Sequence, residues 1–119
     1  MTKSYPEITK RISSNIKVLR KDIADTFIGF SQMAQGATKE GVLDKKTKEY
    51  IALAIGISTR CDGCIGFHAE ALVKLGATRE EFQEVLGMAI YMGGGPSVMY
   101  AADAMLAFEQ FEELHRSKA

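Results

Sequence analysis

The sequence predicts an all-α fold of about five to six helices in a single domain that covers residues 1–119. Apolar residues recur at intervals of three and four along most of the chain, which is the period of an α-helix. No segment alternates convincingly between apolar and polar residues, as a half-buried strand would. With 119 residues the chain has the length at which a single core becomes independently stable.

The composition of the chain indicates a globular protein and argues against several classes of partner. The chain is 46% hydrophobic and 25% charged, which is the ordinary globular range. Its fifteen basic and fifteen acidic residues cancel, so no overall field attracts nucleic acid or an anionic membrane. The amino terminus lacks the apolar run of a secretory signal, and no window has the apolar length of a membrane span. We therefore expect a cytoplasmic protein with neither nucleic-acid nor membrane partners.

The first expected helix covers about residues 7–34. Ser4 suits its N-cap and Pro6 its first turn. Gly36 and Gly41 bracket a polar turn after it. The apolar positions that define this helix are spaced by threes and fours: Ile8, Ile12, Ile16, Leu19, Ile23, Phe27 and Phe30.

A second helix is expected from about Lys45 to Ser58, with Asp44 as its N-cap. Its residues 50–57 include no charged or amide side chain, so this helix should be buried on most sides. Eight such residues in a row also fit a buried strand. Ala52 and Ala54, together with the lysine-rich lead, favour the helix.

Three further helices complete the chain. One runs from near Cys61 to a glycine stop. Thr78 and Glu81 are spaced as a capping box for the next, which the segment 93–96 terminates. The last runs from Ser97 into a charged tail. Because the second and the last of the five helices are apolar on more than one face, a lone bundle would expose hydrophobic surface, and we expect a homo-oligomer.

The residues that can carry chemistry are Cys61 and Cys64, with His68 four residues further on. A helical residue turns by about 100°, so these three positions lie within roughly 60° of one another. Free N–H groups and the positive dipole end of a helix start lower the pKa of a thiol there. Cys64 can also give its proton to His68, directly or through a water molecule. In a reducing compartment such a pair is more often catalytic, redox-sensing or metal-binding than structural.

The residues alone leave alternatives open. Two cysteines and a histidine can simply fill a helix face, because free cysteine is among the most buried residue types. Zinc is a second rival, although its fourth ligand would have to be water or His115, which lies in the charged tail. Glu49 could accept the His68 N–H and fix the tautomer of the ring. A glutamate that ends a lysine-rich turn is, however, usually a solvated surface residue.

A family resemblance rests on five segments of the sequence: Leu43–Glu49, Ile51–Ala54, Cys61–His68, Leu75–Thr78 and Gly94–Pro96. Through them the stretch from Gly41 to about Phe111 resembles the AhpD-like, carboxymuconolactone decarboxylase superfamily of small all-helical proteins. A glutamate twelve residues before a CxxC pair, with a histidine four residues after it, is typical of the redox-active branch of that superfamily.

The resemblance implies a peroxidase of the alkylhydroperoxidase type that forms a trimer or a hexamer. It implies that Glu49 and His68 form a proton relay, that Cys64 becomes a sulfenic acid on meeting a peroxide, and that Cys61 closes the disulfide. It implies no bound organic cofactor and no metal. Since the chain has no dinucleotide fingerprint, electrons must come from a partner such as a dihydrolipoyl group or a thioredoxin-like protein.

One position departs from the family pattern. Gly63 stands where the best-known alkylhydroperoxidase members have a histidine immediately before the second cysteine. The decarboxylases that gave the superfamily its name lack the CxxC pair, so lactone decarboxylation is not indicated, whatever family name the protein carries. The expected function is a thiol–disulfide oxidoreductase with a peroxide or a disulfide as substrate. The alternative is a non-catalytic helical oligomer whose CxxC pair is regulatory or metal-bound.

Overall fold

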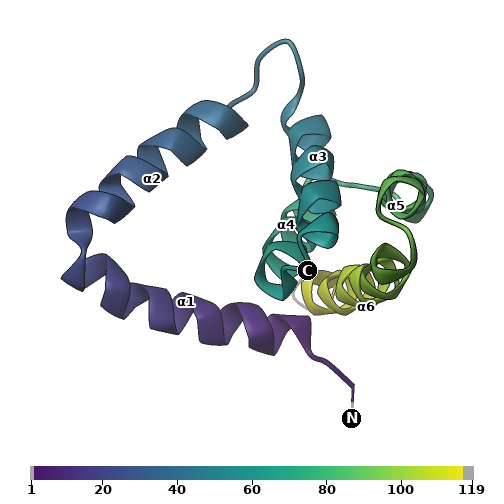
Figure 1. The fold of residues 1–119 in the computed structure, drawn as a ribbon, viewed down its shortest axis with the longest axis horizontal. Coiled ribbons are helices and arrows are strands. Elements are labelled where there is room, and N and C mark those ends of the chain that lie inside the picture. Colours follow the sequence, from purple (N-terminus) through teal and green to yellow (C-terminus); the bar gives the residue numbers. More distant parts are fainter. Residues whose placement is uncertain (1, 117–119) are drawn as a thin grey trace.

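The computed structural model describes residues 2–116, which form six α-helices and no strand (Figure 1). The all-α prediction is confirmed. None of the helices in this range is long and apolar enough to cross a membrane. The helices are α1 (Tyr5–Asp22), α2 (Ala24–Thr38), α3 (Lys45–Ser58), α4 (Asp62–Lys74), α5 (Arg79–Gly93) and α6 (Gly95–Arg116).

The prediction of a single helix over residues 7–34 is wrong, because α1 and α2 are separate helices. The break lies at Ile23, whose φ of −125° and ψ of 57° are not helical. The Ile23 N–H still donates to Leu19 O at 2.8 Å, and the Phe27 N–H donates to Ile23 O at 3.3 Å. Four-residue spacing therefore continues through the break, so the apolar period gives no sign of the change in direction.

Helices α1 and α2 form an arm that projects away from α3, α4, α5 and α6 (Figure 1). No residue of α2 is buried, and α1 buries only Tyr5 and Thr9. Ser4 caps α1 by accepting the Glu7 N–H at 3.3 Å, and Pro6 lies in its first turn, as expected. The arm is thus held to the rest of the molecule mainly through the first turns of α1.

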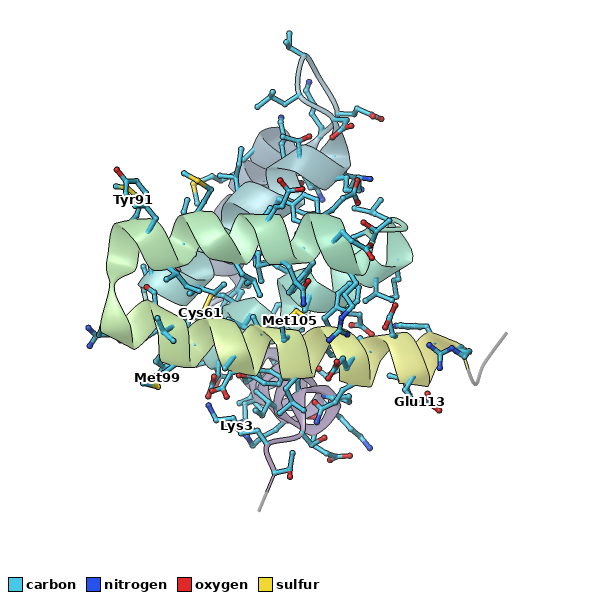
Figure 2. All side chains as sticks on the ribbon, turned by 90° about the vertical axis from the view of Figure 1, so that its right-hand side faces the viewer. Lys3, Cys61, Tyr91, Met99, Met105 and Glu113 are labelled. Atoms are coloured by element: carbon cyan, nitrogen blue, oxygen red, sulfur yellow. A yellow bond between two sulfur atoms is a disulfide. The ribbon has the colours of Figure 1, made fainter. Side chains whose placement is uncertain are left out.

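The core lies among the other four helices and the first turn of α1. Helices α5 and α6 run side by side in opposite directions (Figure 2), and the rings of Phe82 and Phe108 join them with centroids 4.7 Å apart. Each large apolar side chain buried here contributes about 1.5–3 kcal/mol. The largest fully buried side chains are Tyr5, Leu53, Ile57, Ile65, Leu72, Phe82, Phe108 and Phe111.

The expected helix starts are confirmed where a capping side chain marks them. Asp44 accepts the Thr47 N–H at 2.7 Å, and hydrogen bonds from Thr47 hold the pKa of Asp44 below its usual value. Thr78 and Glu81 make the complete capping box of α5. The last helix begins at Gly95 rather than Ser97, because a proline is tolerated in the first turn of a helix as well as after its end.

The expectation that α3 is buried on most sides is wrong for the single chain. Leu53 and Ile57 are fully buried, but Ile51 is 47% exposed and Ile55 is 57% exposed. The apolar run is a helix, as its alanines indicated. Its second apolar face remains open because the arm, and α2 in particular, does not pack over it.

Candidate active site

The turn between α3 and α4 delivers Cys61 to the start of α4. The Cys61 N–H donates to Gly56 O at 3.0 Å and the Arg60 N–H donates to Ile57 O at 3.1 Å. These two bonds form a Schellman motif at the end of α3. Arg60 occupies the left-handed position of the motif with φ of 59°, where glycine is the usual residue and another residue costs roughly 1 kcal/mol. The chain therefore passes from α3 to Cys61 through a single tight turn.

Cys61 is the N-cap of α4, and its Sγ accepts the Cys64 N–H at 3.1 Å. Cys61 and Cys64 form a disulfide, with their Cα atoms 5.2 Å apart, and both residues are half-buried. The predicted CxxC pair thus lies at a helix start and can close on itself. A sulfur that accepts an N–H at a helix start is in the environment that lowers the pKa of a thiol once the pair is reduced.

Helix α1 packs closely against the first turns of α4 at the two glycines of that segment. A Cβ added at Gly63 would lie 2.9 Å from Ile12 Cδ1, and one at Gly66 would lie 2.6 Å from Thr9 Cγ2. Both contacts come from α1, which therefore covers one side of the cysteine pair. The absence of a side chain at Gly63 is what allows that approach.

Helix α3 approaches the second cysteine from another side. Gly56 is buried, and a Cβ built on it would lie 2.9 Å from Cys64 Cβ, a separation that real Cβ atoms essentially never show. Any larger residue at this position would have to push α3 and α4 apart. The position of Cys64 relative to α3 therefore depends on Gly56.

Glu49 and His68 meet across the same pair of helices. The His68 Nδ1 lies 2.6 Å from Glu49 Oε2, which joins α4 to α3. Glu49 is 9% exposed, so its interpretation as a solvated surface residue is wrong; the side chain of His68 remains 30% exposed. A carboxylate that accepts the Nδ1–H fixes the tautomer in which Nε2 is free to take a proton. The arrangement suits a histidine that acts as a base.

A polar network at the start of α4 was not found from the sequence. Lys3 Nζ lies 3.1 Å from both carboxylate oxygens of Asp62, which stands between the two cysteines, and 2.8 Å from Asp103 Oδ2 on α6. The Tyr5 hydroxyl donates to Asp62 Oδ1 at 2.8 Å. Lys3 and Tyr5 are 59 and 57 positions away from Asp62, and no local spacing signals a contact over such separations.

The contacts within this network shift the pKa values of Lys3 and Tyr5. The hydrogen bond with Asp103, with further support from Asp62, raises the pKa of Lys3 above its usual value. Burial, and then the hydrogen bond to Asp62, raise the pKa of Tyr5. Lys3 is therefore a cation and Tyr5 a neutral donor at neutral pH, and both contact the Asp62 carboxylate.

His115, the histidine considered as a further zinc ligand, pairs with another residue. Its Nε2 lies 3.0 Å from Glu70 Oε2, and its ring stacks on Phe111 with centroids 6.5 Å apart. Within residues 2–116 no group of three or more histidine, cysteine or acidic side chains is placed to hold a metal ion.

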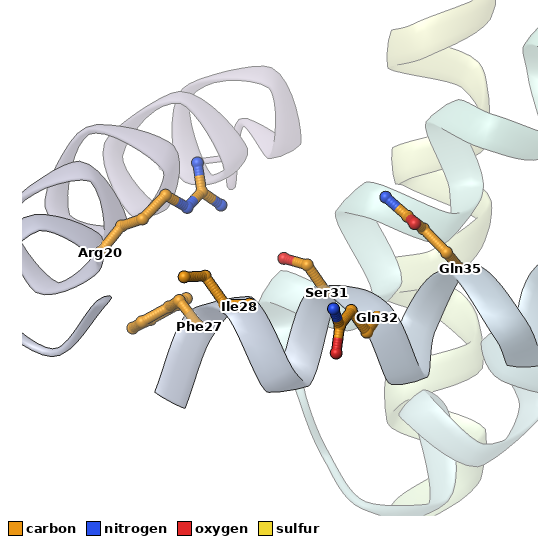
Figure 3. Close-up of a pocket in the computed structure, with 6 residues that line it drawn as sticks. All are labelled: Arg20, Phe27, Ile28, Ser31, Gln32 and Gln35. Carbon is orange, nitrogen blue, oxygen red and sulfur yellow. The ribbon is translucent and has the colours of Figure 1, made fainter. Parts of the chain in front are cut away.

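A groove between α1 and α2 lies apart from the cysteine pair. The groove in Figure 3 lies on the arm, where the Arg20 guanidinium stands 5.7 Å from the ring centroid of Phe27. None of its lining residues belongs to the site described above. These residues are Arg20, Phe27, Ile28, Ser31, Gln32 and Gln35.

Comparisons with known proteins give a consistent result. The model of the carboxymuconolactone decarboxylase family matches residues 24–107. A solved carboxymuconolactone decarboxylase family protein from Legionella pneumophila is 57% identical, with a TM-score of 0.89, and the match covers 91% of this chain and 96% of that one. A solved family protein from Thermotoga maritima, for which a part in an antioxidative response has been suggested, is 26% identical with a TM-score of 0.80 over 91% and 95% of the two chains. An uncharacterized protein from Cupriavidus necator is 41% identical over 80 residues, which are 67% of this chain and 71% of the relative.

Proposed function

The chain belongs to the carboxymuconolactone decarboxylase family, and from that premise we propose that it is a thiol–disulfide oxidoreductase with alkylhydroperoxidase-type peroxidase activity. The observation that carries the proposal is a CxxC disulfide at the start of α4, next to a buried carboxylate that holds a histidine of the same helix. The antioxidative response suggested for the Thermotoga maritima relative agrees with peroxide as the oxidant.

The first chemical step requires a thiolate and a proton carrier. Glu49 accepts the Nδ1–H of His68, so His68 Nε2 takes the proton of the Cys64 thiol one helical turn away. The Cys64 thiolate then attacks the distal oxygen of the hydroperoxide and the O–O bond breaks. The sulfur is oxidised to a sulfenic acid, and the alkoxide leaves as the alcohol with the proton that His68 returns.

The second step closes the disulfide and the third reopens it. The Cys61 thiolate attacks the sulfenic sulfur of Cys64, the S–O bond breaks, and hydroxide leaves as water with one proton. An external dithiol, such as a dihydrolipoyl group or a thioredoxin-like protein, then supplies two electrons and two protons through a mixed disulfide. In the closed form the Cα atoms of the pair are 5.2 Å apart, within the usual range for a disulfide.

One observation supports the opposite order of attack. The Sγ of Cys61 accepts the Cys64 N–H at the helix start, and this bond would stabilise a thiolate on Cys61. In that order Cys61 is the nucleophile toward peroxide, and His68 serves Cys64 as the resolving or leaving thiol. The two orders give opposite results with single cysteine variants.

The proposal is tested by single-turnover oxidation of the fully reduced protein. Hydrogen peroxide, an organic hydroperoxide and a small disulfide are mixed with it separately under the same conditions, and the rate of thiol loss is followed. We expect the organic hydroperoxide to oxidise the pair faster than it oxidises free glutathione. Equal rates for the protein and glutathione with every oxidant would contradict a peroxidase or oxidoreductase site.

Cysteine variants then assign the roles. Cys64→Ser should abolish rapid peroxide consumption, and Cys61→Ser should retain one oxidation event, a sulfenic acid that a dimedone-type reagent traps. Turnover with a reductant should fail in both variants. The reverse pattern, with reactivity kept in Cys64→Ser and lost in Cys61→Ser, would establish Cys61 as the nucleophile.

The proton relay is tested by Glu49→Gln and His68→Ala. Each should slow oxidation of the pair by about 10²-fold, the usual scale for loss of a general base, while both thiols remain titratable. Glu70→Gln is the matched control, because it removes the carboxylate of the other histidine pair. If all three variants react at the rate of the unchanged protein, the Glu49–His68 pair has no part in the chemistry.

A further inference from the structure

The residue between the two cysteines is a carboxylate, and this is unfavourable for a reactive thiol. Asp62 is the first residue of α4, directly after Cys61 and two residues before Cys64. A negative charge within one helical turn of a thiol disfavours the thiolate and opposes the effect of the helix start. Something else must offset the charge of Asp62 if the pair is to be reactive.

The N-terminal segment provides that offset. Lys3 Nζ contacts both oxygens of Asp62 at 3.1 Å, and the Tyr5 hydroxyl donates to one of them at 2.8 Å. Figure 2 shows Lys3 on the α1 side of α6, where the N-terminal segment reaches the bundle. Every described polar contact of the Asp62 carboxylate therefore comes from the segment that precedes or opens α1.

This segment is anchored independently of Asp62. The side chain of Gln110 on α6 accepts the Tyr5 N–H at 2.7 Å and donates to Lys3 O at 2.7 Å. Tyr5 is fully buried, and its ring packs against Gly66, where an added Cβ would lie 3.3 Å from Tyr5 Cδ1. Lys3 is also held by Asp103 at 2.8 Å. The ammonium and the hydroxyl are thus placed in advance and do not need Asp62 to find their position.

We propose that Lys3, supported by Tyr5, is a positioning residue that neutralises Asp62 and thereby sets the reduction potential of the Cys61–Cys64 pair. The proposal rests on the redox function proposed above for this pair. It assigns to the N-terminal segment, which lies outside the family match over residues 24–107, a part in tuning the site.

The direction of the effect follows from the charge of the reduced state. The disulfide is neutral, whereas the dithiol carries a thiolate above its lowest pKa, so an uncompensated Asp62 destabilises the reduced form and favours the disulfide. Loss of Lys3 should make the pair more reducing, and loss of the Asp62 charge should make it more oxidising. The side chains of Lys3 and Asp62 are 41% and 35% exposed, so solvent screens the effect to about three- to tenfold.

The other charged groups of the site stay unchanged in the test. Glu49 and His68 pair across α3 and α4, Asp103 on α6 contacts Lys3, and Arg60 lies in the turn before Cys61. The potential is measured across a pH range that includes values above the pKa of the more acidic thiol. The contribution of Lys3 should appear in full only where that thiol is ionised.

The experiment equilibrates the full-length protein with glutathione buffers, in which protein dithiol and oxidised glutathione exchange with protein disulfide and two reduced glutathione molecules. Lys3→Met should raise this equilibrium constant by about three- to tenfold, where tenfold corresponds to about 30 mV. Asp62→Asn should lower it by a similar factor. In the Asp62→Asn background, Lys3→Met should have a smaller effect than in the unchanged protein. Lys10→Met removes an exposed lysine of α1 and should leave the constant unchanged.

Salt provides a readout that a purely structural role would not move. The differences caused by Lys3→Met and Asp62→Asn should shrink as ionic strength rises. Shifts of the same sign in both variants, or no shift beyond that of Lys10→Met, would overturn the proposal. A shifted potential in a protein that ignores peroxide would contradict the proposed peroxidase activity and leave the role of Lys3 intact, so the two failures are distinguishable.

Discussion

Gly56 is the residue at which α3 comes closest to the reactive part of α4. Gly56→Ala would place a Cβ 2.9 Å from Cys64 Cβ, so the substitution should destabilise the fold by about 1–3 kcal/mol, the usual cost of overpacking. Gly87→Ala is the matched control, because Gly87 lies inside α5 with nothing within 4 Å of an added Cβ. There the intrinsic preference of a helix for alanine should stabilise the protein by about 0.5–1 kcal/mol.

Urea denaturation of both glycine variants measures the two free energies of unfolding. Opposite signs are expected, because both substitutions lower backbone entropy in the unfolded chain and only one of them meets a neighbour. If Gly56→Ala stabilises the protein as much as Gly87→Ala does, the close approach of α3 to Cys64 is not as described.

The sequence predicted the arrangement of those candidate residues that belong to one helix. Cys64 and His68 lie one turn apart within α4, and Cys61 is the N-cap of the same helix, so local geometry fixes how they are spaced. The partner of His68 is different, because Glu49 reaches it through the packing of α3 on α4. The residues alone left that contact as one alternative beside a surface position, and the family pattern favoured it. Lys3 escaped prediction for the same reason, since its contact with Asp62 depends on how α1 docks.

Glu81 connects α5 to α3 in addition to its part in the capping box of α5. Its carboxylate accepts the Thr78 N–H at 3.0 Å within the capping box, and it also contacts Lys46 Nζ and the Tyr50 hydroxyl of α3, both at 3.2 Å. The hydrogen bond from the Thr78 N–H, followed by that from Lys46, holds the pKa of Glu81 below its usual value of 4.5. The start of α5 is thereby linked to α3 through one ionised side chain.

This link predicts a pH-dependent contribution to stability. A carboxyl whose pKa is lower in the folded than in the unfolded protein stabilises the fold above its unfolded pKa and loses that contribution as pH falls through the folded value. Glu81→Gln should therefore destabilise the protein at neutral pH, and the difference should shrink below about pH 4.5. Denaturation at several pH values measures it, with Glu80→Gln as the control on the same turn. A constant difference down to low pH would show that the ionised form of Glu81 is not what matters.

Helix starts that a capping side chain marks could be predicted from the sequence. The break between α1 and α2, which has no such side chain, could not. Asp44 and the Thr78–Glu81 pair mark helix starts through hydrogen bonds that their own neighbours donate, so local sequence suffices. Ile23 interrupts the first helix with neither proline nor glycine, and no side-chain cap opens α2. Such a break depends on the tertiary contacts of α1 and α2. The spacing of apolar residues in the sequence does not indicate those contacts.

Many large apolar side chains are exposed on the described part of the chain. A groove between α3 and α5 includes Ile55, Met88 and Met92, whose exposed fractions are 57%, 60% and 75%. On α2, which buries nothing, Phe30 is 59% exposed. Contiguous patches of this kind usually mark an interface between protein chains. The homo-oligomer expected from the sequence remains a prediction that this surface supports.

Sedimentation at micromolar concentration tests the oligomer. The protein should have a mass that is a multiple of the 13.0 kDa chain, and the family resemblance suggests a trimer or a hexamer. Ile55→Glu should lower the average mass, because a charge would be buried without a partner. Gln83→Glu adds the same charge at an exposed polar position of α5 and should not. A monomeric wild-type protein would mean that these apolar faces serve another purpose.

The redox cycle of the two thiols is the central claim, and one titration tests it most directly. The metal content of the purified, reduced protein is measured first, and small increments of an organic hydroperoxide are then added while free thiols and remaining peroxide are counted. We predict no stoichiometric zinc and the loss of two thiols for each peroxide consumed, both restored by a dithiol reductant. One tightly bound zinc per chain with protected thiols, or thiols that persist beside unconsumed peroxide, would contradict the account.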